Sequence, residues 1–268
     1  MGSRHMTDWE AALRLSSFLL VFTVFALLEW WRPFRPAERR RWASNLGLSL
    51  LGTLLLRLVF PVAATGVALW ASAQGVGVAN QLALPLLVSV PLGILLLDML
   101  IYWQHRLFHR IPWLWRLHRV HHADLAVDVS TGLRFHPVEF LLSMLIKAIA
   151  VALLGLPALA VLLFEVWLNA CALFNHSNIA LPEALERRLR SWLITPQLHR
   201  IHHSRRWQES QHNFGFSLSC WDRFFGSFQS RAQAGNAVQL GLPEPRQLPQ
   251  GLWFLLWSPF ERRKEKEE

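Results

Sequence analysis

The sequence is poor in cysteine and lacks the motifs of several common redox cofactors. It contains two cysteines, Cys171 and Cys220, in 268 residues, which are too few for a disulfide framework and form no CxxC metal signature. It contains no haem motif, no iron–sulfur cysteine set and no Gly-rich dinucleotide fingerprint. These absences exclude a chain that carries its own haem, iron–sulfur cluster or dinucleotide.

Charge is also scarce, and it is absent from long apolar runs. Apolar residues make up 53% of the chain and charged residues 17%. Residues 15–28 carry no charge, residues 46–71 carry only Arg57, and residues 82–103 carry only Asp98. The second and third runs are near the roughly 20 residues that a helix needs to cross a bilayer, and the first closes with the polar and aromatic rim "EWWR" typical of a helix that reaches the headgroups. We therefore expect three membrane-spanning helices.

A helical hairpin is expected further along the chain. The apolar residues 138–154 and 157–174 flank Gly155 and Pro157, which favour a reversal of the chain. Whether the hairpin crosses the membrane or re-enters it, the chain returns to the same side, so residues 104–136 and 175–231 share one face. Lys147 and Glu165 lie eight residues from Gly155 and Pro157, so we expect them to face one another or a shared polar cavity. The alternative is that Lys147 reaches outward and Glu165 lines a substrate tunnel.

The charge distribution predicts the orientation. The segment "RPFRPAERRR" has five arginines between Arg32 and Arg41, whereas "ASAQGVGVANQ" has no charge. The positive-inside rule then places residues 104–136 in the cytoplasm, and we expect a bacterial inner-membrane protein. The net charge of +9 is attributed to the flanks of membrane spans and not to nucleic-acid binding.

The expected fold is an all-α integral-membrane helical bundle, with three spans plus a helical hairpin and a cytoplasmic histidine-rich helical cap. The opening "MGSRHM", residues 1–6, is interpreted as a cloning remnant. Residues 7–268 are expected to form a single membrane-embedded domain. The final "ERRKEKEE" is expected to be a solvated tail.

Histidine is the residue that carries chemistry. Eleven of the twelve histidines lie between His105 and His212, and eight of them form one H-x3-H box and two H-x2-H-H boxes. These eight are His105, His109, His118, His121, His122, His199, His202 and His203. Residues three and four apart share one face of a helix, so each box is expected to aim its imidazoles to one side.

The number of histidines predicts two metal ions. One ion accepts about four to six ligands, and eight or more convergent imidazoles exceed that number. Imidazole by itself does not choose between iron, zinc and copper. The alternative is a set of pH-sensing or lipid-facing histidines, but crowded imidazolium groups would repel one another.

The segment between Asp98 and Phe228 resembles the fatty acid hydroxylase/sterol desaturase superfamily of integral-membrane enzymes. The resemblance rests on "DMLIYWQHRLFHR", "LHRVHHAD", "RFHPVEF", "FNHSNI", "LHRIHHS" and "HNFGFSLSCWDRFFGSF". It implies two iron ions on histidines, O2 as co-substrate, and hydroxylation or, as the alternative, desaturation of a membrane lipid such as a fatty acyl chain or sterol. Zinc can replace iron in recombinant material. Electrons are expected from a ferredoxin or a cytochrome with its reductase.

The resemblance extends to single residues. His176 in "FNHSNI" matches a family histidine and is expected to be a ninth ligand, although some members have a further histidine where Ala172 stands here. His136 and His212 are either partners of ligands or ordinary structural histidines. Asp98 shares a helical stripe with His105 and His109, so it is expected to orient a ligand histidine or to pair with Arg57.

Two other classes compete with this reading. A membrane zinc hydrolase would ordinarily show H-E-x-x-H, and no histidine box here contains glutamate. A metal transporter or sensor would place its ligands along the spans and not in one cap. Both are therefore weaker interpretations than a lipid oxygenase.

Overall fold

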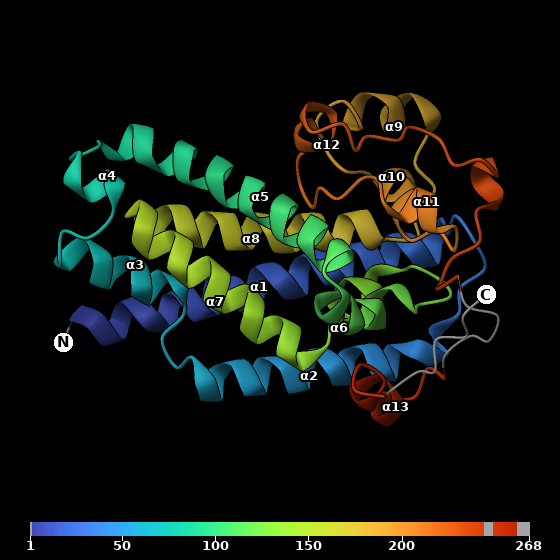
Figure 1. The fold of residues 1–268 in the computed structure, drawn as a ribbon, viewed down its shortest axis with the longest axis horizontal. Coiled ribbons are helices and arrows are strands. Elements are labelled where there is room, and N and C mark those ends of the chain that lie inside the picture. Colours follow the sequence, from blue (N-terminus) through green and yellow to red (C-terminus); the bar gives the residue numbers. More distant parts are fainter. Residues whose placement is uncertain (1, 244–248, 262–268) are drawn as a thin grey trace.

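The computed structural model describes residues 2–243 and 249–261, and these residues form helices joined by turns and loops. The long helices lie side by side as a bundle in Figure 1. Their bounds are α1 (Gly2–Trp31), α2 (Trp42–Val59), α3 (Ala64–Ala73), α5 (Leu86–Arg110), α7 (Pro137–Leu154) and α8 (Ala158–His176). Most of the other elements gather at one end of the bundle, which we call the cap (Figure 1).

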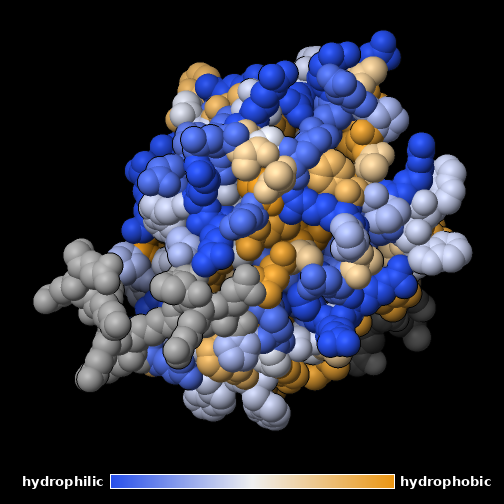
Figure 2. Space-filling model, turned by 90° about the vertical axis from the view of Figure 1, so that its right-hand side faces the viewer, coloured by the Kyte–Doolittle hydropathy of each residue, from blue (hydrophilic) through white to orange (hydrophobic). Residues whose placement is uncertain are grey.

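The cap is built from short helices. They are η1 (Arg39–Arg41), α6 (Pro112–His122), η2 (Val129–Leu133), α9 (Glu183–Leu189), α10 (Pro196–His202), α11 (Trp207–Ser210), α12 (Cys220–Phe224), η3 (Gly235–Ala237) and α13 (Leu252–Trp257). The remaining short helix, α4 (Val78–Gln81), lies at the opposite end. Seen end-on, the cap presents mainly hydrophilic side chains around a central hydrophobic patch (Figure 2). The tail expected at "ERRKEKEE" lies almost wholly outside the described residues.

Five helical segments are long and apolar enough to cross a membrane among the described residues: Trp9–Trp31, Arg39–Gln81, Leu86–Arg110, Pro137–Leu154 and Ala158–His176. They correspond to the three predicted spans and the two arms of the predicted hairpin. The protein is therefore an all-α integral-membrane protein.

The second predicted span, residues 46–71, is not one continuous helix. It divides into α2 and α3, and Phe60 leaves the helical conformation with φ −122° and ψ 76°. Pro61 explains the break, because proline disfavours the α conformation in the preceding residue and has no N–H to donate. The third span starts and ends later than predicted, since α5 continues to Arg110 and carries its first histidines into the cap.

The hairpin is formed as expected. Gly155 ends α7 in the left-handed conformation, with φ +65°, which glycine adopts without a steric cost. Lys147 of α7 donates to Glu165 Oε1 of α8, which confirms that the two charges face one another. Arg14 of α1 also donates to this carboxylate, from Nη2 to Oε2 at 2.8 Å, a second partner that the sequence reading missed.

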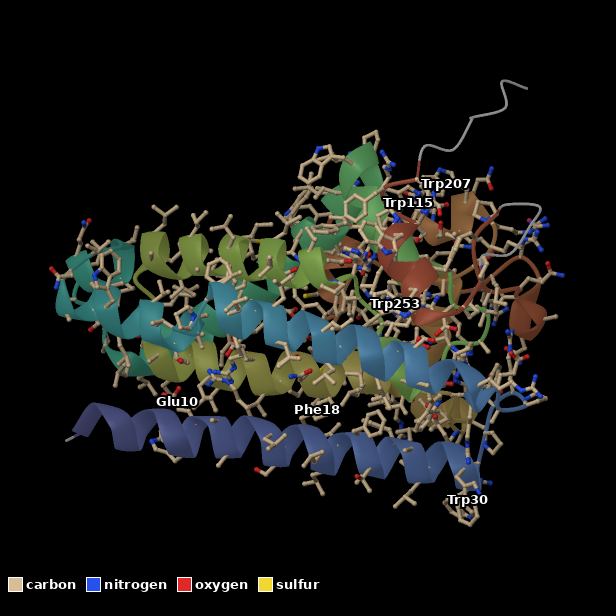
Figure 3. All side chains as sticks on the ribbon, turned by 90° about the horizontal axis from the view of Figure 1, so that it is seen from below. Glu10, Phe18, Trp30, Trp115, Trp207 and Trp253 are labelled. Carbon is tan, nitrogen blue, oxygen red and sulfur yellow. The ribbon has the colours of Figure 1, made fainter. Side chains whose placement is uncertain are left out.

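The bundle packs in two layers around an apolar core. Leu97 and Ile101 of α5 pack with Val161 and Phe164 of α8 and with Met144 of α7. Helix α1 packs along α8, and α2 packs along α7. In Figure 3, Glu10 and Phe18 point from α1 toward the rest of the bundle, whereas Trp30 points away from it. This packing holds the cap ends of α5 and α8 next to α6 and α10.

Candidate metal centre

Four helices bring the nine histidines together. His105 and His109 lie in the last turns of α5, His118, His121 and His122 in α6, and His176 at the end of α8. His199 and His202 lie in α10, and His203 follows directly. Both short helices begin with proline at their first position, which is preorganised for a helix start. All nine side chains are buried, with at most 3% of any residue exposed.

The nine ligand candidates divide into two groups whose nitrogens lie within 4.8 Å of one another. The five-histidine group is His105, His109, His118, His122 and His202. The four-histidine group is His121, His176, His199 and His203. The two groups adjoin, since the rings of His122 and His203 lie 4.5 Å apart, but the two H-x2-H-H boxes are divided between them. Each of them contributes two residues spaced i and i+4 to one group and its third residue to the other.

Oxygens outside the two groups hold the Nδ1 atoms of five of the nine histidines. Nδ1–H donates to Phe214 O at 2.7 Å from His105, to His212 O at 2.8 Å from His202, and to Ala172 O at 2.6 Å from His176. His121 Nδ1 donates to Arg134 O at 3.2 Å, and His118 Nδ1 donates to Glu139 Oε1 at 2.8 Å. A neutral imidazole carries one N–H, so these five rings present a bare lone pair at Nε2.

The Nε2 atoms face one another at short distances. They lie 3.1 Å apart in His105 and His118, 2.9 Å apart in His105 and His202, and 3.0 Å apart in His121 and His176. None of these pairs can share a proton, because every ring already places its hydrogen on Nδ1. Facing lone pairs repel, whereas an ion that accepted both lone pairs would replace the repulsion by two bonds. The histidines therefore fit metal ions.

His203 gives independent support for the fit. Both of its ring nitrogens are buried without a hydrogen-bond partner among the described residues, and so is Nδ1 of His199. Leaving a buried polar atom unpaired costs about 1 to 3 kcal/mol. Such a cost, next to three other histidines of the same group, is expected at a ligand position whose partner is an ion.

Burial also keeps the imidazoles in the form that binds metal. It lowers the pKa of His118 to about 3. Burial, followed by repulsion from neighbouring histidines, holds the pKa well below the ordinary value in His121, His122, His199, His202 and His203. Metals bind the deprotonated nitrogen, so these residues are ready as ligands at neutral pH.

Glu139 is the functional candidate that the sequence reading missed. It lies in the first turn of α7, is 5% exposed, and accepts the His118 hydrogen bond through Oε1. Carboxylates in this position orient a ligand histidine and raise its basicity. The available signal was a glutamate at the start of an apolar span, in "HPVEF", because such charges are costly unless they serve a function.

The other three candidates lie elsewhere. Asp98 accepts from Trp221 Nε1 at 2.9 Å and from Leu218 N at 3.3 Å, and within the described residues it bonds neither a ligand histidine nor Arg57. Asp98 therefore links Trp221 and Leu218 of the cap to α5. His136 caps α7, accepting from Val138 N, and donates to Leu256 O.

The ring of His212 turns away from both histidine groups. It donates to Gln208 O at 2.8 Å, and only the main-chain carbonyl of His212 reaches the site, through His202. Neither the His136 ring nor the His212 ring bonds a ligand histidine among the described residues.

A cavity of about 740 Å³ leads to the five-histidine group. It lies between α1 and α2 on one side and α7 and α8 on the other, and its lining includes His105, His118 and Glu139. Apolar side chains such as Phe18, Phe140 and Phe216 line much of the remainder. The volume is in the range of small-molecule sites, and the lining suits an apolar chain.

The family profile described as fatty acid hydroxylase matches residues 90–227. The chain belongs to the fatty acid hydroxylase family. The matched region contains all nine histidines and Glu139. The superfamily resemblance inferred from the histidine boxes is therefore confirmed.

Three relatives illustrate the range of this fatty acid hydroxylase family. An ornithine lipid hydroxylase of Rhizobium tropici is 31% identical over 187 residues, which cover 68% of this chain and 54% of the relative. An alkylglycerol monooxygenase of Danio rerio is 30% identical over 159 residues, covering 58% and 33%. A cholesterol 25-hydroxylase of Homo sapiens is 27% identical over 250 residues, covering 84% and 89%.

The match thus spans about half of the first relative and about a third of the second. No solved structure is significantly similar to the chain.

Proposed function

We propose that this protein is a membrane-bound oxygenase that uses O2 to hydroxylate an unactivated C–H bond of a lipid. The observation that supports the proposal is the set of Nε2 atoms described above, which face one another about 3 Å apart and fit ions bound between them. We assign two iron ions, one to the five-histidine group and one to the four-histidine group.

When bound, the metal pair supplies the O2 activation that no protein side chain can provide. The residues of this chain hold and orient it. Glu139 and the main-chain carbonyls of Phe214 and His212 fix the rings through Nδ1. The apolar cavity holds a lipid chain beside His105 and His118 and excludes water from the reacting bond.

The names of the relatives support lipid hydroxylation, since the three are described as an ornithine lipid hydroxylase, an alkylglycerol monooxygenase and a cholesterol 25-hydroxylase. The cap is assigned to the cytoplasmic side, because the arginines between Arg32 and Arg41 lie at its end of the bundle. Electrons are assigned to a separate carrier, a ferredoxin or a cytochrome with its reductase.

The test is a comparison of lipid extracts from cells that express the protein or its His121→Ala variant. A lipid that gains the mass of one oxygen only with the unmodified protein supports hydroxylation, and a loss of two hydrogens identifies a desaturase on the same site. Bound metal is measured in parallel. Identical lipid profiles with metal-loaded protein would contradict the proposal.

A further inference from the structure

The substrate cavity contains charged side chains that the metal centre does not use. Arg14 of α1, Arg57 of α2, Lys147 of α7 and Glu165 of α8 all line it. Glu165 accepts from both Arg14 and Lys147, and Arg14 also donates to Glu10 Oε2 at 3.3 Å. We call these five residues the charge cluster. Charges inside a span are costly and mark functional sites by default.

The charge cluster lies at one depth in the bundle, away from the histidines. Gly52 of α2 packs against the ring of Phe140 of α7, and both helices run away from the cap. Five residues beyond Gly52, α2 reaches Arg57, about 7.5 Å further along; seven residues beyond Phe140, α7 reaches Lys147, about 10.5 Å further along. Arg57 and Lys147 therefore lie within about 3 Å of the same level.

The distance from this level to the metal centre follows from α7. Glu139, which bonds His118, and Lys147 are eight residues apart on one helix, which corresponds to about 12 Å along its axis. Both residues line the same cavity. A ligand that fills the cavity therefore reaches from the charge cluster to the five-histidine group.

The charge cluster has one positive charge in excess. Arg14, Arg57 and Lys147 are cationic, whereas Glu10 and Glu165 are acidic, which leaves three positive charges against two negative ones. The two acids are taken up by Arg14 and Lys147. Arg57 forms no hydrogen bond or ion pair with any described residue. It lies in an apolar span, lines the cavity and is exposed. An arginine exposed within an apolar span faces lipid unless an anion meets it there.

We propose that Arg57, which lines the same cavity as Lys147 and Arg14, binds the acidic group of the lipid substrate, a carboxylate or a phosphate. This inference rests on the proposed function, because it assigns the other end of the same lipid to the metal centre. The planar guanidinium of Arg57 offers several donors to such a group, which suits bidentate binding. The oxidised C–H bond then lies about 12 Å from the acidic group.

The test measures lipid binding and not turnover, so it uses zinc-loaded protein in phosphatidylcholine nanodiscs. The probes are hexadecanoate, hexadecyl phosphate and hexadecanol, which share one chain and differ in the polar group. We expect at least one acidic probe to bind roughly 10-fold or more tighter than hexadecanol, as a charge-assisted hydrogen bond predicts. The tighter of the two identifies carboxylate or phosphate as the preferred group. Equal binding of all three probes overturns the proposal.

Variants assign the effect to Arg57. Arg57→Gln should weaken binding of the preferred acid by roughly 10-fold to 100-fold and leave hexadecanol binding unchanged. Arg57→Lys should retain most of the affinity, because it keeps the charge. The matched control is Arg187→Gln on the exposed surface of α9. Unchanged acid binding in Arg57→Gln would show that Arg57 reaches out to lipid headgroups. Equal losses for acid and alcohol would show general damage to the cavity. Either result overturns the proposal.

These outcomes are separate from those of the proposed function. Charge-selective binding without oxidation by the iron-loaded protein would leave the lipid site standing and remove the oxygenase. Oxidised product with no charge selectivity in binding would do the reverse.

Discussion

Glu139 allows the sharpest test of how the protein holds its metals. Its carboxylate accepts from His118 Nδ1 at 2.8 Å and is buried. Glu139→Gln keeps an acceptor but loses the charge, which roughly halves the strength of the hydrogen bond. A loss of about 1 kcal/mol lowers metal affinity by about 5-fold. Glu139→Ala removes the acceptor, and a loss of about 2 to 3 kcal/mol corresponds to about 30-fold to 150-fold.

The assay is release of metal to a competing chelator, with the bound ions counted by mass spectrometry. Because His118 belongs to the five-histidine group, one ion of two should become labile and the other should stay. The control is Ser143→Ala, also on α7 and in the cavity lining, whose hydroxyl accepts from Gln104 Nε2 at 2.8 Å and bonds no ligand histidine among the described residues. His199→Ala removes a ligand of the four-histidine group. In protein that carries this substitution, the ion of the five-histidine group should still be released faster by Glu139→Ala, to the same extent as without it. Equal release of both ions, or release as slow as in the control, would refute the assigned role.

Four further outcomes are expected. His121→Ala and His202→Ala should each abolish turnover and lower the metal content, since each removes a ligand of a different group, while circular dichroism shows the helices retained. Glu165→Lys should lower the thermal midpoint in detergent more than Lys147→Glu, because Glu165 also pairs with Arg14. For the same reason the double swap should recover only part of the loss. If the two losses simply add in the double swap, Lys147 and Glu165 do not stabilise the protein as an ion pair. Removing metal from the unmodified protein should lower its thermal midpoint, since facing lone pairs are left without ions, and re-addition of Zn²⁺ should restore it. Lengthening an acidic lipid by two methylenes should leave the oxidised carbon at the same distance from the acidic group, as read from product fragmentation; a position fixed from the chain end would contradict the charge cluster as the reference point.

The spans were predictable because hydrophobicity is a local property of the chain. Long apolar runs and the Gly155 reversal predicted the five long segments and the Lys147–Glu165 contact, since antiparallel arms bring residues equidistant from the turn to one depth. The break at Phe60 was missed, although Pro61 was a sufficient local signal.

The nine histidines were predicted from their number and spacing, whereas their orienting partners were not. Phe214, His212 and Ala172 act through main-chain carbonyls, and a carbonyl is present in every residue, so no side-chain pattern identifies it. Asp98 was expected beside a histidine because it shares a helical stripe with His105. The helical spacing predicted the face of α5 on which Asp98 lies. Its partners, Trp221 and Leu218, come from the cap and depend on the tertiary structure.

By itself, the sequence determined the class of the protein: an all-α membrane bundle with clustered histidine ligands for metal, because hydropathy and i, i+4 spacing act within one helix. Only the tertiary structure decided how the ligands are shared. The two H-x2-H-H boxes divide between two groups because α6 packs against α5 and α10 packs against α8. Each short helix presents its two histidines four residues apart to the histidines of its neighbour, and its remaining histidine to the other group. The tertiary structure also brought Arg57 to the level of Lys147 in one cavity, since the relative depth of two helices depends on their packing and not on either sequence.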